Sequence, residues 1–198
     1  MSPRKYDMSK RSRSVEETRQ RIIEATIAAH GELGMLETTY QDVAARADVA
    51  LGTVHRHFPT VEDLVDACGR AFLPTLALPT PSDAADRFRN LASDTDRIER
   101  LAHDVADIYD RALPVFLEVR RASTQLAAAA EGLRAMEASI DALVDEALLP
   151  LNPTADQRST VRALTDARFW DALCGSGLNR QQIGATAARL LHCALKAR

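Results

Sequence analysis

The stretch of residues 39–58 constrains the fold of this chain more than any other part of the sequence. It contains two short helical patterns that are separated by only a few residues. In the first pattern, Val43 and Ala47 lie four residues apart on one apolar stripe. The Thr39 hydroxyl precedes this stripe as a helix cap, and Asp42 follows three residues later, where the partner of a capping box belongs. The first pattern therefore predicts a short helix with a defined start.

The second pattern follows Asp48, a residue type that tolerates the left-handed conformation needed in a tight turn. It predicts a helix from about Leu51 to His57, with Val54 and Phe58 on its inward face. Small side chains near its start suit entry into a DNA major groove, and the basic and imidazole groups further on suit phosphate contacts. The outward residues are Gly52, Thr53, His55, Arg56 and His57. The two patterns together predict a helix-turn-helix in which the second helix reads DNA.

Helical patterns also flank this motif. Ser14 and Glu17 form a predicted capping box for a helix over residues 15–33, which would support the reading helix. Thr60 is the expected cap of a further helix over residues 61–72. Its apolar face is predicted to consist of Val61, Leu64, Val65, Cys68 and Phe72.

Charge is distributed unevenly along the chain, although the net charge is only −3. Residues 1–13 carry five basic residues against one acidic residue, whereas residues 61–198 carry 16 basic and 20 acidic residues. A basic leader on an acidic body is expected when one end of a protein meets DNA. Residues 1–14 are expected to be a flexible basic arm, which either lies on DNA or is a solvated tail.

The segment "TTYQDVAARADVALGTVHRHFPTVEDL" resembles the DNA-binding segment of the TetR/AcrR family of transcriptional repressors, and the similarity spans roughly Val15 to Phe72. Three positions depart from the family pattern. Asp48 stands where glycine is usual, His55 where tyrosine is usual, and Val61 where lysine is usual. The last two positions are phosphate contacts in the family, so the resemblance implies a weaker grip on the DNA backbone.

The resemblance implies an all-α chain in three parts: a basic arm over residues 1–14, a helix-turn-helix domain over residues 15–73, and a helical effector-binding and dimerisation domain over residues 74–198. It also implies a repressor that is released from a palindromic operator by a small molecule. The expected partners are double-stranded DNA, a second copy of the chain and an unknown effector, with no membrane, cofactor or metal. The expected DNA-contacting residues are Thr38, Thr39, Tyr40, Leu51, Gly52, Thr53, His55, Arg56 and His57.

Beyond three prolines within residues 73–82, which mark the expected domain boundary, the pattern is helical throughout. Helices are expected at about 83–92, 94–111, 114–123, 125–149, 154–174 and 180–196. A mixed set of side chains in the middle helices could line an effector pocket: His103, Tyr109, Phe116, Arg120, Met136 and Phe169.

The last two expected helices carry apolar stripes with small residues that allow close helix approach. These stripes either close the core of the monomer or form a dimer interface, and the resemblance favours the dimer. The expected interface residues are Val161, Leu164, Phe169, Leu173, Ile183, Ala187, Leu190, Leu191 and Ala194.

No motif for catalysis is recognised. Gly175-Ser176-Gly177 follows a helix and lacks the remaining glycines and the lysine of a phosphate-binding loop, so an enzyme is not expected. The three cysteines are widely spaced, and the polar N-terminus differs from a signal peptide, which predicts a cytoplasmic protein. The alternative function is a protein-interaction module that uses the helix-turn-helix fold without binding DNA. Salt-dependent binding to duplex DNA separates the two.

Overall fold

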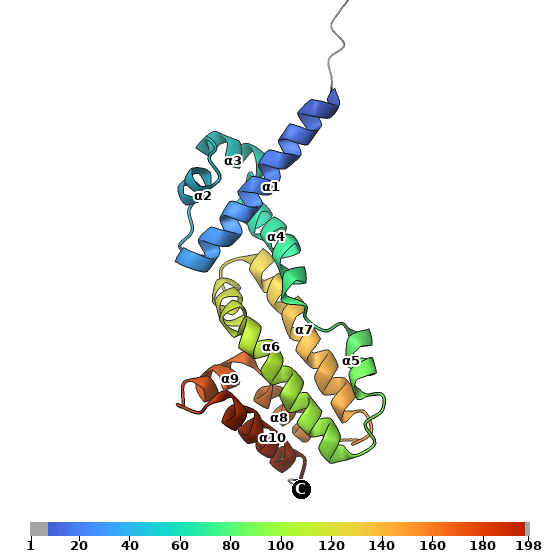
Figure 1. The fold of residues 1–198 in the computed structure, drawn as a ribbon. Helices are drawn as coiled ribbons and strands as arrows, with labels where there is room; N and C mark the ends of the chain where they lie inside the picture. The colour runs from blue at the N-terminus through green and yellow to red at the C-terminus, as the bar shows by residue number, and fades with distance from the viewer. Residues whose placement is uncertain (1–7, 197–198) are drawn as a thin grey trace, which may run out of the picture. The chain divides into compact units, whose positions relative to one another are not determined.

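The computed structural model describes residues 8–196, and this part of the chain is helical without any strand, as the sequence predicts (Figure 1). None of the described helices is long and apolar enough to cross a membrane. The elements are α1 (Met8–Leu33), α2 (Tyr40–Arg46), α3 (Leu51–His57), α4 (Val61–Phe72), a 3-10 turn η1 (Leu73–Leu76), α5 (Pro81–Phe88), α6 (Asp94–Ala122), α7 (Ala127–Leu148), α8 (Ala155–Leu164), α9 (Ala167–Cys174) and α10 (Arg180–Lys196).

The chain divides into two compact units. The first, called the reader unit here, comprises the residues up to Thr75 together with Ala122–Ala130. The second, called the C-terminal unit, comprises Leu76–Arg121 and the chain from Glu131 onward. Because the segment 122–130 lies far along the sequence, its place in the reader unit was not predicted.

The reader unit has one core to which helices α1 to α4 each contribute. Its buried residues include Ile22 of α1, Val43 of α2, Val54 of α3 and Leu64 of α4. Phe58, directly after α3, is only 1% exposed. The predicted inward face of α3 is therefore confirmed, and this helix is held by its apolar side while the opposite side is left to solvent.

The helix ends of the reader unit follow local sequence rules. The Thr39 hydroxyl accepts a hydrogen bond from the Asp42 N–H at 3.2 Å, and the Asp42 carboxylate accepts one from the Thr39 N–H at 2.9 Å. Thr60 and Asp63 form the same capping box at the start of α4. Asp48 has a φ of 52°, in the left-handed region that the turn before α3 requires. The predicted caps and turn are confirmed.

Other predictions for this unit are wrong. Helix α1 begins at Met8, so Ser14 lies inside it and its carbonyl accepts a bond from the Thr18 hydroxyl at 2.8 Å instead of heading a capping box. The expected flexible arm is thus helical from residue 8, and its residues 1–7 lie outside the described part. Val61 is 48% exposed, because the first turn of α4 extends beyond the core that Leu64 enters.

The C-terminal unit is built around α6 and α7, with α8, α9 and α10 forming a second group of helices (Figure 1). Arg97 of α6 is 7% exposed, and it forms hydrogen bonds with the ends of two helices that are far apart in the sequence. Its guanidinium donates to the carbonyl of Phe88 at the end of α5 at 2.9 Å, to that of Leu91 at 3.0 Å, and to those of Glu146 and Ala147 near the end of α7. The Phe88 and Glu146 carbonyls also accept the N–H groups of Leu91 and Leu149, at 3.2 and 3.3 Å, so the arginine adds a second donor to these two. Such carbonyls at a helix end are left without an intrahelical partner, and the guanidinium helps to satisfy them.

Helix boundaries in the C-terminal unit differ from the prediction in three places. Pro114 lies inside α6 and does not end it, because buried neighbours such as Leu113 and Phe116 hold both sides of the helix in the core. The helix expected over 154–174 is divided at Thr165, whose hydroxyl bonds to preceding carbonyls, and Asp166, which caps α9. Helix α5 begins and ends earlier than expected.

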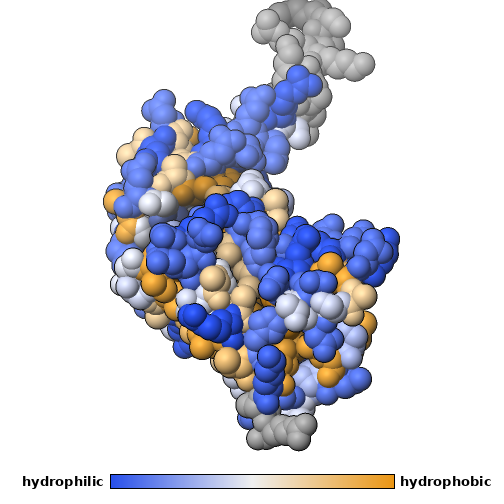
Figure 2. All heavy atoms as spheres, turned by 60° about the horizontal axis from the view of Figure 1, so that its bottom comes forward, coloured by the Kyte–Doolittle hydropathy of each residue, from blue (hydrophilic) through white to orange (hydrophobic). Residues whose placement is uncertain are grey.

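Apolar residues on the surface are scattered. Figure 2 shows one side of the molecule, on which apolar patches alternate with hydrophilic residues. Among the described residues, the large apolar side chains with most exposure are Val15, Leu33, Leu51, Val61 and Leu149.

Candidate DNA-contacting surface and effector region

The outward face of α3 is available to a partner. Gly52, His55 and Arg56 are exposed, and Thr53 is partly exposed. A Cβ atom added at Gly52 would have no neighbour within 4 Å, so packing inside this chain does not require a glycine there. The absent side chain instead leaves the leading end of α3 open to close approach by another surface.

Three expected DNA-contacting hydroxyls are already engaged within the chain. The Thr38 hydroxyl donates to the Gly34 carbonyl at 2.7 Å, and the Thr39 hydroxyl donates to the Asp42 carboxylate at 2.5 Å. The Tyr40 hydroxyl donates to the Phe58 carbonyl at 2.9 Å. Each of these protons has a partner that fixes the backbone around α2.

Tyr40 also packs against α3. Its ring lies against the His55 ring, with 4.5 Å between the ring centroids. Burial, and in second place the Asp63 carboxylate, raise the pKa of Tyr40, so this hydroxyl keeps its proton at neutral pH. Tyr40 therefore connects the start of α2 with the end of α3 through its hydroxyl bond to Phe58 and its ring contact with His55.

Two arginines, Arg56 and Arg19, lie near His57 at the C-terminal end of α3, and the sequence indicated only the first of them. Burial lowers the pKa of His57, and the nearby Arg56 and Arg19 guanidiniums lower it further. Arg19 comes from α1 and lies over the Phe58 ring, 4.9 Å from its centroid. Sequence spacing along α3 alone gave no sign of Arg19, because its neighbourhood is created by the packing of α1.

The expected effector residues divide between two places. Tyr109, Phe116 and Met136 are buried, and the Tyr109 ring lies 5.2 Å from Phe116 and 5.6 Å from Trp170 between centroids. The Tyr109 hydroxyl donates to the Thr165 carbonyl at 2.8 Å, and burial raises its pKa. The sequence missed Trp170 as a member of this aromatic cluster.

Charged groups lie beside the expected effector residues. Arg120 of α6 forms ion pairs with Glu137 of α7 at 2.8 Å and with Asp166 before α9 at 2.9 Å. Phe169 is half-buried on α9. These contacts join three helices of the C-terminal unit around one set of charges.

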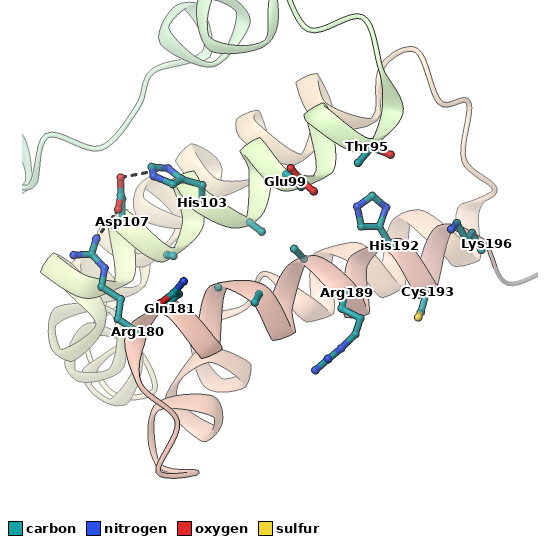
Figure 3. A pocket seen from close by; sticks show the side chains of 15 residues that line it. Thr95, Glu99, His103, Asp107, Arg180, Gln181, Arg189, His192, Cys193 and Lys196 are labelled. Atoms are coloured by element: carbon teal, nitrogen blue, oxygen red, sulfur yellow. Dashed lines mark hydrogen bonds and ion pairs between the residues drawn. The ribbon is translucent and has the colours of Figure 1, made fainter.

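His103 lies elsewhere, in a groove of about 1040 Å³ between α6 and α10 (Figure 3). Its Nδ1 atom is 3.5 Å from an Asp107 carboxylate oxygen, and Asp107 also pairs with Arg180 of α10 at 2.6 Å. Small residues of α10, Gly184 and Ala188, line the groove. Neither Tyr109 nor Phe116 lines this groove, so His103 is separated from the other expected effector residues.

The expected dimer stripe is also divided. Val161, Ile183, Ala187 and Leu191 are no more than 9% exposed within a single chain, so they close its core and offer almost no surface to a partner. Assigning these four to an interface is corrected by their burial. The partly exposed members of the predicted set are Leu164, Phe169, Leu173, Leu190 and Ala194.

Two observations on the described residues concern metal ligands and the buried Cys68 thiol. No group of three or more His, Cys, Asp or Glu side chains among these described residues could hold a metal ion. Burial raises the pKa of the Cys68 thiol to about 12, so the reactive thiolate is not formed at neutral pH.

Comparisons with known proteins decide the family. The model of the bacterial regulatory proteins of the tetR family matches residues 22–68, from α1 through α4. The HTH-type transcriptional repressor KstR of Mycobacterium tuberculosis is 31% identical over 161 residues, 78% of this chain and 69% of that protein. This chain belongs to the TetR family. A KstR repressor of Rhodococcus jostii is 27% identical over 158 residues, which cover 78% of this chain and 71% of that protein.

Solved structures show that the TetR fold extends over the whole chain. The multidrug binding protein EbrR, crystallised with imidazole, has a TM-score of 0.66 at 22% identity and covers 100% of this chain and 99% of its own. A TetR-family member from Streptomyces coelicolor has a TM-score of 0.61 at 22% identity, with 88% of this chain and 98% of its own covered. The chain is therefore a DNA-binding transcriptional regulator, and the matched family region includes α2 and α3.

Proposed function

We propose that this TetR-family chain is a cytoplasmic, non-enzymatic repressor. It binds a palindromic operator as a homodimer, and a small-molecule effector releases it. The exposed outward face of α3, held from behind by the buried Val54 and Phe58, is the observation that carries this proposal. The TetR-family match over residues 22–68 supports it.

Within the reader unit, we assign two kinds of role to the nine expected DNA-contacting residues. Leu51, Gly52, Thr53, His55, Arg56 and His57 face the DNA from α3. A phosphate accepts hydrogen bonds, so the hydroxyls of Thr38, Thr39 and Tyr40 would have to release their present acceptors in order to donate to it. These three therefore position the reading helix.

Selection of duplexes from a random pool tests the DNA assignment. The selected sequence should be palindromic, and log K should fall with log salt by roughly 0.9 for each phosphate neutralised. Arg56→Gln should reduce that slope by about one phosphate and weaken binding to all duplexes alike. Arg46→Gln is the matched control, because Arg46 is already paired with Glu32 at 2.8 Å.

Salt-insensitive binding, or equal slopes in the parent, Arg56→Gln and Arg46→Gln, would remove Arg56 from the contacts. Failure to enrich any duplex would favour the alternative of a helix-turn-helix module that contacts protein.

The effector site is proposed at the aromatic cluster of the C-terminal unit, where Tyr109, Phe116 and Met136 meet the Arg120 ion pairs. An apolar site with a few charged groups is typical of small-molecule binding. Trp170, the single tryptophan of the chain, lies in this cluster with 2% exposure and reports on it directly. Compounds that release the operator should change the Trp170 fluorescence. Release without any change would place the effector elsewhere, with the His103 groove as the next site to test.

The dimer contact is proposed on the partly exposed side of α8, α9 and α10 that carries Leu164 and Leu190. Leu190→Arg places a charge in that contact, and sedimentation should then show folded monomers that no longer bind the palindrome. Ala185→Arg is the matched control, because Ala185 lies on the groove side of the same helix. If Ala185→Arg dissociates the dimer and Leu190→Arg does not, the groove side of α10 is the interface.

A further inference from the structure

The first N–H groups of helix α7 bind a carboxylate from another helix, Glu62 of α4. The first turn of α7 contains no acidic residue of its own. The two carboxylate oxygens of Glu62 in α4 accept hydrogen bonds from the N–H groups of Ala127 and Ala128, at 2.9 and 2.8 Å. A carboxylate is the favoured group at this end of a helix, since unpaired N–H donors and the positive end of the helix dipole meet there.

The carboxylate of Glu62 is not required by its own helix. The start of α4 is already satisfied by the capping box of Thr60 and Asp63. The Glu62 carboxylate can therefore accept hydrogen bonds from α7, which begins 65 residues later in the sequence.

Glu62 lies in a segment whose neighbours on both sides are packed in the reader core. It lies four residues after Phe58, the buried residue that ends α3 and accepts the Tyr40 hydroxyl bond. On its other side, Leu64 and Cys68 anchor α4 in the reader core. A movement of α4 that displaces Glu62 therefore also displaces the segment that follows α3.

The far part of α7 belongs to the C-terminal unit. The helix is continuous from Ala127 to Leu148, although Ala127–Ala130 cluster with the reader unit and the residues from Glu131 onward with the other. Met136 and Leu143 are fully buried, and Glu137 pairs with Arg120 at 2.8 Å. One helix thus carries both the groups beside the proposed effector site and the N–H groups that bind Glu62.

We propose that Glu62 is a positioning residue that couples the setting of α7 to the DNA-binding state of α3. The proposal rests on the proposed function, because it concerns the regulation of the same DNA-reading surface. When DNA fixes the reader, Glu62 restrains the first turn of α7, and an effector that shifts α7 works against the same two hydrogen bonds. Coupling between two sites is reciprocal, so it can be measured from the DNA side before any effector is known.

Amide hydrogen exchange of the full-length dimer, with and without a selected palindromic duplex, tests this coupling. In the parent, exchange of the amides in residues 127–140 should slow on the order of threefold or more when duplex is added in saturating amount. Glu62→Ala should bind the duplex at saturation but leave exchange in residues 131–140 unchanged. Without DNA, the amides of Ala127 and Ala128 should exchange on the order of tenfold faster in this variant, because their acceptor is gone.

Two further variants separate coupling from a general effect of mutating α4. Asp66→Ala removes a carboxylate from the same helix, but this exposed side chain pairs with Arg70 of its own helix, so the variant should behave as the parent does. Glu62→Gln keeps an acceptor oxygen without the charge and should retain a smaller DNA-dependent slowing. Circular dichroism and a mobility shift at saturation confirm that each variant is folded and bound.

Equal DNA-dependent slowing in the parent and in Glu62→Ala would overturn the coupling, and so would the absence of slowing in a parent that binds its duplex. A parent that binds no selected duplex would instead overturn the proposed function, and the coupling with it.

Discussion

The two units differ in how far apart in the sequence their polar contacts reach. In the reader unit, the caps of α2 and α4 join residues three positions apart, and the Tyr40–Phe58 bond spans 18. In the C-terminal unit, Arg97 bonds across 50 positions and Tyr109 across 56. Apart from the bonds of Glu62 to the start of α7, which span 65 and 66 positions, the reader unit is thus organised largely by its local sequence. The C-terminal unit depends on buried groups that meet only after the chain has folded.

This difference suits the two tasks. A reading helix needs one fixed shape, which local caps and a small apolar core can supply. An effector-binding bundle needs helices whose relative setting can change, and long-range polar contacts such as the Arg120 ion pairs join helices in a way that a ligand can replace. We expect the two units to respond separately to substitution.

The largest expected effect comes from Arg97. Arg97→Met removes four hydrogen bonds from a charged donor, each worth about 1.5–3 kcal/mol. The carbonyls of Leu91 and Ala147 lose the bond from Arg97 without a backbone N–H to replace it, whereas those of Phe88 and Glu146 keep a bond from a backbone N–H. Part of this is offset because a cation no longer has to be buried, so we expect a loss of about 5 kcal/mol in the free energy of unfolding of the C-terminal unit. Arg89→Met is the control, because Arg89 is exposed and its pair with Asp86 contributes less than about 1 kcal/mol.

Two-step chemical denaturation followed by circular dichroism measures this effect. Only the step that belongs to the C-terminal unit should move in Arg97→Met. A loss no larger than that of Arg89→Met would mean that water replaces the guanidinium at little cost, and the long-range contacts would then not be what stabilises this unit.

Phe58→Ala makes the corresponding test in the reader unit. Removing this 1%-exposed ring should lower the free energy of unfolding by about 3–5 kcal/mol. The same denaturation should show a shift of the reader step alone, with the C-terminal step unchanged. Leu51→Ala, at an exposed position on α3, should shift neither step appreciably. A common shift of both steps in Phe58→Ala would show that the units unfold as one, and the comparison between them would fail.

The same difference explains what the sequence could predict. The caps at Thr39 and Thr60 and the inward position of Phe58 depend on neighbours a few residues away, so spacing alone indicated them. The position of His103 in a groove with Arg180, and the contact of Glu62 with α7, depend on which helices pack together. The stripe at Ile183 and Leu191 shows the limit clearly, since its apolar spacing fits a monomer core and a dimer interface equally well.

A smaller loss of stability is expected for Tyr40→Phe, which tests whether Tyr40 supports α3 or contacts DNA. Tyr40→Phe keeps the ring against His55 and removes the hydroxyl bond to the Phe58 carbonyl. The free energy of unfolding should fall by about 1 kcal/mol, the usual net value of one such bond. If Tyr40 only supports α3, affinity for the selected duplex measured by fluorescence anisotropy should stay close to that of the parent. A loss of about 1 kcal/mol in binding free energy, equal for all duplexes, would show instead that the hydroxyl donates to a DNA phosphate.

The smallest expected effect, and the most specific, is the pH response of His57. Burial, Arg56 and Arg19 lower the pKa of His57 in the folded chain, and Glu16 only partly opposes them. The unfolded chain therefore binds a proton that the folded chain releases, so below about pH 6.5 the stability of the reader unit falls as pH decreases. A DNA phosphate beside His57 acts in the opposite direction, because it favours the imidazolium, and operator affinity should rise as pH decreases over the same range.

His57→Gln separates these two responses, because glutamine keeps hydrogen-bonding capacity without a titrating charge. The variant should lose part of the pH dependence of unfolding measured by urea denaturation between pH 5 and pH 8, about the scale of one shifted group. It should also lose part of the rise in operator affinity measured over the same range by fluorescence anisotropy. His192→Gln in α10 is the control, since this imidazole lies in the groove of the other unit. If His57→Gln changes the stability response but not the affinity response, His57 belongs to the folding of the reader unit and lies outside its contact with DNA.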